Sequence, residues 1–416
     1  MRILKTAICF LILGVIALNL AACAPGVQAA DLMTGIAGKT VQEKAVDAKF
    51  IDNTADFSLE LFRNSIAERE NSLVSPLSVL LALAMTANGA GSETLEEMEA
   101  VLGKEIPLGE LNEYLYTYVK LLPSEKNSKL KVANSIWFRD DENRLTVEKD
   151  FLQKNADYYN AAAYKAPFDS QTLLDINNWV KQKTDNMIEK ILDEINEDAV
   201  MYLINAIVFE AQWQQVYNKE NVREGDFTTI DGGREQVDFM YSEENIYLES
   251  DKATGFIKPY ADNNYSFVAL LPKEGIAIQD YIEGLTGDVF MGTLDSADNI
   301  AVSAGLPKFS HAYTVQMNDA LKDMGMPLAF SPQSADFSPL GKSTRGNIYI
   351  GEVLHKTFIQ VDELGTKAGA VTKVEIRDEA YYETKNVVLD RPFVYAIIDN
   401  SSKLPVFVGS VMQIAD

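Results

Sequence analysis

"GTKAGAVTKVEIRDEAYYETKN", residues 365–386, carries the signature of a loop and that of a β-strand. Its first residues are small, which is typical of a flexible surface hinge. From residue 366 to residue 376, every second position is small or apolar: Thr366, Ala368, Ala370, Thr372, Val374 and Ile376. This period of two predicts a half-buried strand. A shift of one residue would bury four charged side chains, those of Lys367, Lys373, Glu375 and Arg377. The pattern therefore fixes the register of the strand.

The composition of the rest of the chain supports a globular protein. The 416 residues suffice for one large domain or for two or three average ones, and 47% are hydrophobic. The net charge of −24 disfavours a nucleic-acid partner, because an acidic surface is repelled by phosphate groups. We interpret the acidity mainly as an aid to solubility.

The N-terminus has the pattern of a secretory signal. Arg2 and Lys5 precede the apolar run "TAICFLILGVIALNLAAC", which ends in small residues and a cysteine. "LAAC" (20–23) resembles the bacterial lipobox, so we predict a lipoprotein signal peptide at 1–22 and a lipid anchor on Cys23. The protein would then face the extracellular side of a bacterial membrane. Cleavage further along, near "VQAA" (27–30), would instead release it into the medium.

Cysteine usage and hydropathy limit the remaining organisation. Cys9 and Cys23 are the only cysteines, so a processed protein would contain no disulfide. Beyond residue 30, no apolar run is long and uncharged enough for a membrane span. We predict a small, polar tether at 23–50 and a folded domain at 51–416.

Helical patterns precede strand patterns along the chain. Helical spacing is expected over 56–66, from Pro76 onward with Ser75 as the cap, over 91–103 and over 172–192. Later segments are rich in β-branched and aromatic residues: "VANSIWF", "AVMYLINAIVFEAQW", "YSFVALLP", "IAVSAGLPKFS", "HKTFIQV", "FVYAII" and "PVFVGSV". This order predicts an α+β fold with a mixed sheet.

Two polar residues, Asn205 and His355, interrupt apolar strands. Each requires a hydrogen-bonding partner, because an unpaired buried polar group costs about 1–3 kcal/mol. Ser75 and Ser78, at the start of an apolar helix, are candidate partners. Two interpretations stay open from the residues alone: four unrelated, locally satisfied groups, or one buried cluster.

Several sequence blocks, in order, resemble one family, the serpins. "HKTFIQVDELGTKAGAVT" resembles the serpin hinge, and "RPFVYAIIDNSSKLPVFVGSV" resembles the C-terminal hairpin of that family. Further blocks match over the chain from about residue 50: "NSLVSPLSVLLALAMTANGAGSET", "NAIVFEAQW", "LPKFS" and "ADFSPL". The resemblance implies helices on a large central mixed sheet, smaller additional sheets and an exposed reactive-centre loop.

The resemblance also assigns roles to individual positions. The hinge would comprise Glu363, Gly365, Thr366, Lys367, Ala368, Gly369 and Ala370. Ser75, Ser78, Asn205 and His355 would form the "shutter" as one cluster, beneath the strands that open for the loop. Trp213, Lys308 and Glu363 would form the "breach", where the loop first enters, with a Lys308–Glu363 ion pair as a latch. Lys367 departs from the glutamate frequent in inhibitory members, but its side chain is predicted to face outward, so we expect little harm to insertion.

The family spacing from the hinge glutamate places the reactive bond at Glu379–Ala380. Counting back from "RPF" reaches Tyr381 instead, so Tyr381, Tyr382 and Arg377 are alternatives. Each choice implies a different protease: acid-specific for Glu379, chymotrypsin- or subtilisin-like for the tyrosines, trypsin-like for Arg377.

By resemblance, the function is suicide inhibition of extracellular serine proteases. The partner would be a target protease held in a covalent complex, and the inhibitor would be monomeric without cofactor or metal. A non-inhibitory binding protein of the same fold is the alternative. An enzyme is disfavoured, because His311 and His355 are the only histidines and no HExxH, GxSxG or phosphate-loop motif occurs.

Overall fold

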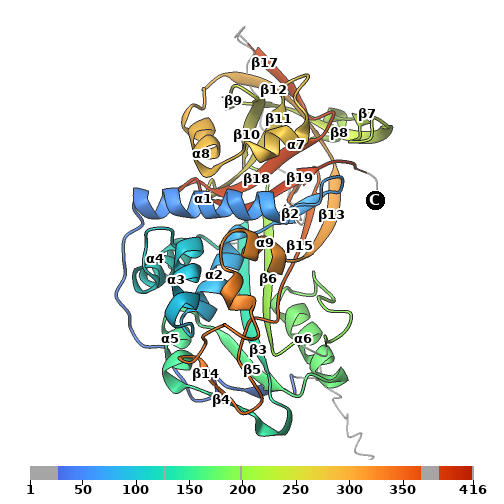
Figure 1. Cartoon of the computed structure of the whole chain (residues 1–416). Coiled ribbons are helices and arrows are strands. Elements are labelled where there is room, and N and C mark those ends of the chain that lie inside the picture. The colour runs from blue at the N-terminus through green and yellow to red at the C-terminus, as the bar shows by residue number, and fades with distance from the viewer. Residues whose placement is uncertain (1–26, 125–127, 197–198, 367–383, 415–416) are drawn as a thin grey trace, which may run out of the picture.

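The computed structural model describes residues 27–124, 128–196, 199–366 and 384–414 (Figure 1). The α-helices among these residues are α1 Ala48–Ser65, α2 Pro76–Ala87, α3 Ser92–Leu102, α4 Leu108–Leu121, α5 Lys149–Tyr159, α6 Ser170–Lys183, α7 Ile278–Glu283, α8 Gly287–Asp295 and α9 Asn318–Asp323. Short 3₁₀ turns are η1 Asp141–Asn143, η2 Lys219–Asn221 and η3 Pro327–Phe330. None of the described helices is long and apolar enough to cross a bilayer.

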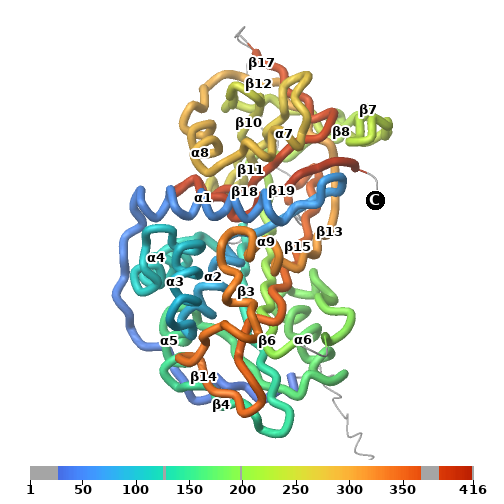
Figure 2. Tube along the Cα trace, viewed as in Figure 1, coloured from blue at the N-terminus to red at the C-terminus, as the bar shows by residue number. Residues whose placement is uncertain are grey.

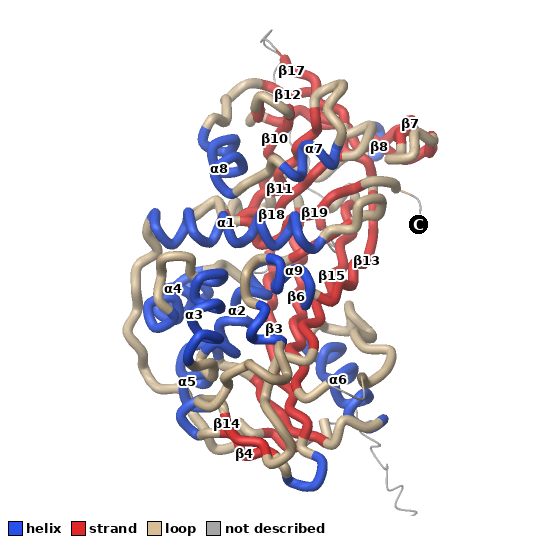
Figure 3. The backbone as a smooth tube through the Cα atoms, in the orientation of Figure 1, coloured by secondary structure: helices blue, strands red, loops and turns tan. Residues whose placement is uncertain are grey.

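A seven-stranded mixed sheet runs through the centre of the molecule, as the sequence predicted (Figure 3). Its spatial order is β1 Ala30–Asp31, β5 Ala162–Ala166, β3 Ser128–Arg139, β6 Met201–Gln212, β16 Gly365–Thr366, β15 Glu352–Val361 and β13 Phe309–Gln316. β3 runs antiparallel to β6, whereas β15 runs parallel to β6. The central strand β6 is buried over most of its length, which explains its continuous apolar sequence.

The smaller sheets are built mainly from the C-terminal half of the chain. A six-stranded sheet has the order β2 Ser72–Val74, β19 Pro405–Val411, β18 Phe393–Asp399, β11 Tyr265–Pro272, β10 Ala253–Pro259 and β9 Tyr247–Glu249. A four-stranded sheet has the order β17 Thr384–Val388, β12 Ala301–Pro307, β8 Arg234–Glu244 and β7 Val222–Thr228, and β14 Gly341–Ser343 pairs with β4 Leu145–Val147. Helices α2 to α6 gather at one end of the molecule, and α7 and α8 lie at the other (Figure 2).

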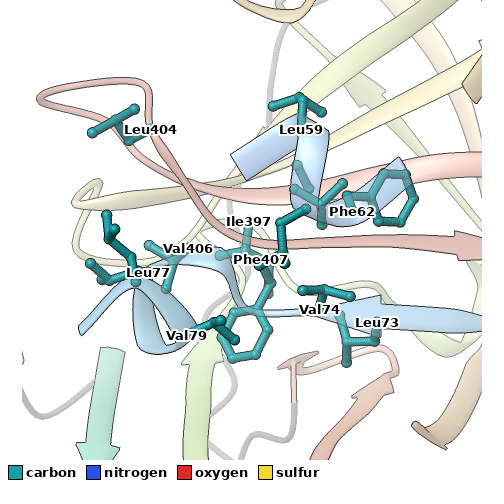
Figure 4. Packing of buried hydrophobic residues seen from close by; sticks show 14 of the residues in the cluster. Leu59, Phe62, Leu73, Val74, Leu77, Val79, Ile397, Leu404, Val406 and Phe407 are labelled. Atoms are coloured by element: carbon teal, nitrogen blue, oxygen red, sulfur yellow. The ribbon is translucent and has the colours of Figure 1, made fainter. Parts of the chain in front are cut away.

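The main hydrophobic core joins α1, α2 and the β18–β19 hairpin (Figure 4). Phe62 of α1 and Leu77 of α2 are fully or nearly fully buried, as are Val406 and Phe407 of β19. Helix α2 is buried on every side, which follows from its uniformly apolar sequence, and Pro76 occupies its first turn. Burying each such large side chain stabilises the fold by about 1.5–3 kcal/mol.

The described part of the predicted tether lies along the domain. The main-chain N–H groups of Gln28 and Ala29 donate to the buried carboxylate of Asp175 at 2.8 and 2.7 Å. Ala30 and Asp31 pair with β5 at the edge of the central sheet. The helix predicted from residue 56 begins at Ala48, where Asp47 accepts a hydrogen bond from the Phe50 N–H.

Two local predictions are wrong in detail. The helix expected over 172–192 ends at Lys183, because Asp185 and Asn186 adopt left-handed φ angles of 51° and 65°. The following segment folds back, and its Ile188 and Ile191 are buried without helical structure. Ser75 precedes α2 as expected, but its side chain does not cap the helix and donates instead to the Val406 carbonyl at 2.8 Å.

Candidate functional site

The two central strands β6 and β15 are paired at one end and separated at the other. Residues 202–206 form a parallel ladder with residues 352–356. Near the opposite end, β16 lies between them and pairs with Ala211 and Gln212 of β6 and with Val361 of β15. Within the described residues, no ladder joins 207–210 to 357–360. The sheet therefore contains a split that already holds the first two residues of an additional strand.

The shutter residues lie together where the paired ladder ends. Asn205 and His355 are register partners across the β6–β15 ladder. The side-chain oxygen Oδ1 of Asn205 accepts two hydrogen bonds of 2.6 Å, one from the hydroxyl of Ser78 and one from Nδ1 of His355. The Ser75 N–H donates to His355 Nε2 at 3.0 Å, and the Asn205 amide donates to the Asn134 oxygen at 2.6 Å. The structure thus brings all four predicted residues into one network that bridges the strands.

The four predicted residues of this network are fully buried and uncharged. Ser75, Ser78, Asn205 and His355 have no exposed surface. Because Nε2 of His355 accepts the Ser75 N–H, its proton lies on Nδ1, where it is donated to Asn205. Burial lowers the pKa of His355 from 6.5 to about 3. A protonated ring would also lose the Ser75 hydrogen bond, so the geometry selects the uncharged form.

The breach lies at the separated end of the strands. The Trp213 indole N–H donates to the Asp362 carbonyl at 2.8 Å, and its main-chain N–H donates to the Leu364 carbonyl at 2.9 Å. The indole stacks on Tyr260, with ring centroids 4.6 Å apart and planes 8° from parallel. The Tyr260 hydroxyl lies 2.6 Å from the hydroxyl of Thr366. Trp213 and Tyr260 therefore form a platform for the start of the hinge.

Charged groups join the hinge to the neighbouring sheet beside this platform. Lys308 Nζ lies 2.5 Å from the Glu363 carboxylate and 3.2 Å from that of Asp238. Both Lys308 and Glu363 side chains are 30% exposed. Burial opposes the charge on Lys308, but its hydrogen bonds to Glu363 and Asp238 outweigh that effect and raise its pKa. The predicted ion pair is present, and Asp238 is its third member.

Only the beginning of the predicted hinge belongs to the described residues. Gly365 approaches β6 so closely that a Cβ atom would lie 2.1 Å from the Ala211 carbonyl oxygen, which explains the glycine. Thr366 is buried, in keeping with its predicted inward orientation. The other predicted positions lie outside the described residues: Lys367, Ala368, Gly369 and Ala370, the reactive-bond candidates Arg377, Glu379, Ala380, Tyr381 and Tyr382, and Cys23.

Sequence reasoning missed three participants. Asn134 stands inside the quoted strand "VANSIWF", and the polar-in-apolar criterion that selected Asn205 would have found it. Tyr260 and Asp238 carry no comparable signal, because their roles depend on contacts between distant strands. Among the residues that the structure describes, no group of three or more His, Cys, Asp or Glu could hold a metal ion.

Comparison with known proteins defines the class. The family model Serpin (serine protease inhibitor) matches residues 52–414. Human neuroserpin is 27% identical over 391 residues, covering 90% of this chain and 94% of neuroserpin. The chain belongs to the serpin family, whose members are mostly protease inhibitors, although some are not.

Two crystal structures of one thermophilic serpin, tengpin, indicate the conformation. The structure of native tengpin matches with a TM-score of 0.90 and 58% identity, and the match covers 93% of this chain and all of the tengpin chain. The structure of latent tengpin matches with a TM-score of 0.81 and 57% identity, and the match covers 90% of this chain and all of the tengpin chain. The split between β6 and β15 thus occurs in a fold more similar to the native than to the latent arrangement.

Proposed function

We propose that this serpin is a suicide inhibitor of extracellular serine proteases. The observation that carries the proposal is the split between β6 and β15, with Gly365 and Thr366 already paired at its open end. The chain that continues from Thr366 has the alternating pattern of a central strand. A loop released by cleavage could extend this pairing with its apolar residues inward and its charges outward.

The chemistry of the first step would be supplied by the protease. Its catalytic serine attacks the carbonyl carbon of the reactive bond, for which we propose Glu379–Ala380. A serine ester forms, the C–N bond breaks, and the protease histidine transfers the serine proton to the departing amine. Extension of β16 then moves the attached protease along the sheet before water hydrolyses the ester. The serpin contributes the bait and the strand, since serpins are generally inhibitors rather than enzymes.

The decisive experiment is incubation of the uncut protein with trypsin-, chymotrypsin-, subtilisin-, elastase- and glutamate-specific proteases. We expect an adduct that survives SDS, and mass spectrometry should place its ester at Glu379. Thr366→Arg is the matched variant, because it places a charge at a buried position beside Tyr260. This variant should be cleaved without forming the adduct. Cleavage of the unmodified protein without an adduct across the whole panel would refute inhibition.

A non-inhibitory binding protein is the second candidate, because some serpins do not inhibit proteases. The two functions differ in the fate of the loop after cleavage. An inserted loop adds a strand to the central sheet and should raise the melting temperature strongly, whereas a loop that stays outside leaves it nearly unchanged. The small hinge residues Ala368, Gly369 and Ala370 favour insertion.

We further propose that the protein is exported and anchored through Cys23, with release into the medium as the alternative. The support is the sequence pattern of residues 1–23 alone. Metabolic labelling with a fatty-acid analogue should modify the full chain and leave a Cys23→Ala variant unlabelled. Equal labelling of both, or of neither, would contradict the anchor. Size-exclusion chromatography of the released domain tests the proposed monomer.

A further inference from the structure

A buried ion pair lies next to Trp213, one of the residues of the breach. Lys258 of β10 and Glu244 of β8 join two different sheets, with Nζ and Oε1 2.7 Å apart. Their side chains are only 2% and 7% exposed. The Ser242 hydroxyl donates a second hydrogen bond to the same carboxylate oxygen at 2.6 Å. Neither residue was singled out from the sequence, because one lysine and one glutamate in separate strands carry no recognisable pattern.

The ammonium group of Lys258 also faces two aromatic rings. It lies 4.3 Å from the centroid of the Tyr217 ring and 5.5 Å from that of Trp213. Both distances fall within the range of cation–π attraction, which is strongest where the cation is desolvated. Lys258 therefore contacts both rings, while Glu244 fixes the position of the ammonium group.

Tyr217 and Trp213 in turn hold the main chain of the hinge. The Tyr217 N–H donates to the Glu363 carbonyl at 3.0 Å. The two Trp213 donors reach the carbonyls of Leu364 and Asp362. These bonds immediately precede the two residues of β16 that occupy the split. Lys258 can thus influence the register of the entering strand through the two aromatic residues.

The pair is not explained by stability alone. Replacing a buried ion pair by uncharged groups of similar volume is often neutral or stabilising, so we expect a variant that removes both charges to fold. A cavity of about 210 Å³ borders the pair and is lined also by Gln214 and Gln215. Removing one partner alone leaves an uncompensated buried charge, so the double variant is the main test.

We infer that Lys258, fixed by Glu244, is a positioning residue that holds Trp213 and Tyr217 in the geometry needed for strand entry. This inference rests on the proposed inhibitory function for its consequence, though not for its structural part. Without the contacts of Lys258 with the two rings, the hydrogen bonds from the Trp213 and Tyr217 main-chain N–H groups to the hinge carbonyls open more often. After cleavage, strand extension begins more slowly, and more of the acyl-enzyme is hydrolysed before it is trapped.

The test uses the full uncut protein and the double variant Lys258→Met/Glu244→Gln, which removes both charges and retains similar volumes. Lys258→Met alone is the second variant. The control is Lys273→Met, which breaks the exposed Lys273–Glu249 pair beside the same sheet (35% and 51% exposed). Two readouts are measured: hydrogen exchange of the Trp213 and Tyr217 amides, and the number of inhibitor molecules consumed per protease trapped.

For the double variant we expect exchange of both amides to be about tenfold faster, in line with the loss of two desolvated cation–π contacts. The melting temperature should stay close to that of the unmodified protein. The number of inhibitors consumed per trapped protease should rise about threefold or more, since slower entry favours hydrolysis. Lys273→Met should change neither readout.

The outcomes separate this inference from the proposed function. Unchanged exchange at Trp213 and Tyr217 in the double variant would overturn the inference outright. Faster exchange with unchanged consumption of an active inhibitor would overturn its functional part. If the unmodified protein traps no protease, inhibition fails, while faster exchange in the variant would still establish Lys258 as the residue that positions the hinge.

Discussion

The shutter and the breach lie at opposite ends of the same pair of strands, β6 and β15, and are held together by opposite kinds of interaction. At the paired end, uncharged side chains of Asn205 and His355 bridge the strands in a dry interior. At the open end, Lys308 and Glu363 form a charged contact with nearly a third of each side chain exposed. Directional hydrogen bonds are strong where water is excluded, whereas exposed ion pairs contribute little. We therefore expect β6 and β15 to separate more easily at the breach than at the shutter.

The largest effect should follow from removing the central amide of the shutter. Asn205→Ala removes the partner of Ser78 and of the Nδ1 proton of His355, which are both fully buried, and also the donor to the half-buried Asn134. We expect the free energy of unfolding of the uncut protein to fall by about 3 kcal/mol in urea titrations. Asn64→Ala removes one exposed hydrogen bond, from the Asn64 side-chain amide to the Glu60 main-chain carbonyl, and should cost less than about 0.5 kcal/mol. Equal losses would show that the buried network contributes nothing special.

The second effect concerns acid. The folded-state pKa of His355 is about 3, below its unfolded value of 6.5. The unfolded chain therefore binds a proton that the native chain does not bind, so this contribution is complete above pH 6.5 and is lost progressively as the pH falls toward 3. Between pH 7 and pH 5 the loss should be about 2 kcal/mol.

His355→Gln provides the comparison, because glutamine cannot be protonated in this range. We expect the difference in unfolding free energy between the two proteins to shrink as the pH falls from 7 to 5. A difference that is constant with pH would mean that His355 does not carry the acid sensitivity, and the neutral shutter would lose its main experimental signature.

A smaller effect is expected at the platform that links the two regions. Tyr260→Phe removes the hydroxyl beside Thr366 and retains the stacking on Trp213. The loss of one buried hydrogen bond should lower the unfolding free energy by about 1 kcal/mol. Thr366→Val should give a similar loss, and the double variant should lose no more than either single one. Additive losses would show that the two hydroxyls do not interact.

The same contrast explains which features the sequence could and could not predict. The α+β class and the mixed sheet were predictable from the order of helical and strand patterns. A polar residue inside an apolar strand showed that Asn205 and His355 needed partners, but their union with Ser75 and Ser78 in one cluster was predicted only from the family resemblance. The end of α6 was mispredicted, because its folded-back continuation buries Ile188 and Ile191 with the spacing of a helix. Tyr260 and Asp238 acquire their roles only through tertiary contacts, so no local pattern identifies them.

The smallest effect should be found at the latch itself. A double-mutant cycle with Lys308→Met and Glu363→Gln should give a coupling of about 0.5 kcal/mol, the magnitude of a partly exposed pair. Asp238 reduces it further, because it retains an interaction with Lys308 when Glu363 is neutral. The coupling should fall by about half in 1 M salt, where the Debye length is about 3 Å.

A corresponding cycle across the shutter, Ser78→Ala with Asn205→Ala, supplies the reference for that measurement. Its coupling should be larger and independent of salt, because ions do not enter the buried network. A latch coupling that exceeds the shutter coupling, or that resists salt, would reverse the order in which the two regions open. Strand entry would then be limited at the breach rather than at the ladder between Asn205 and His355.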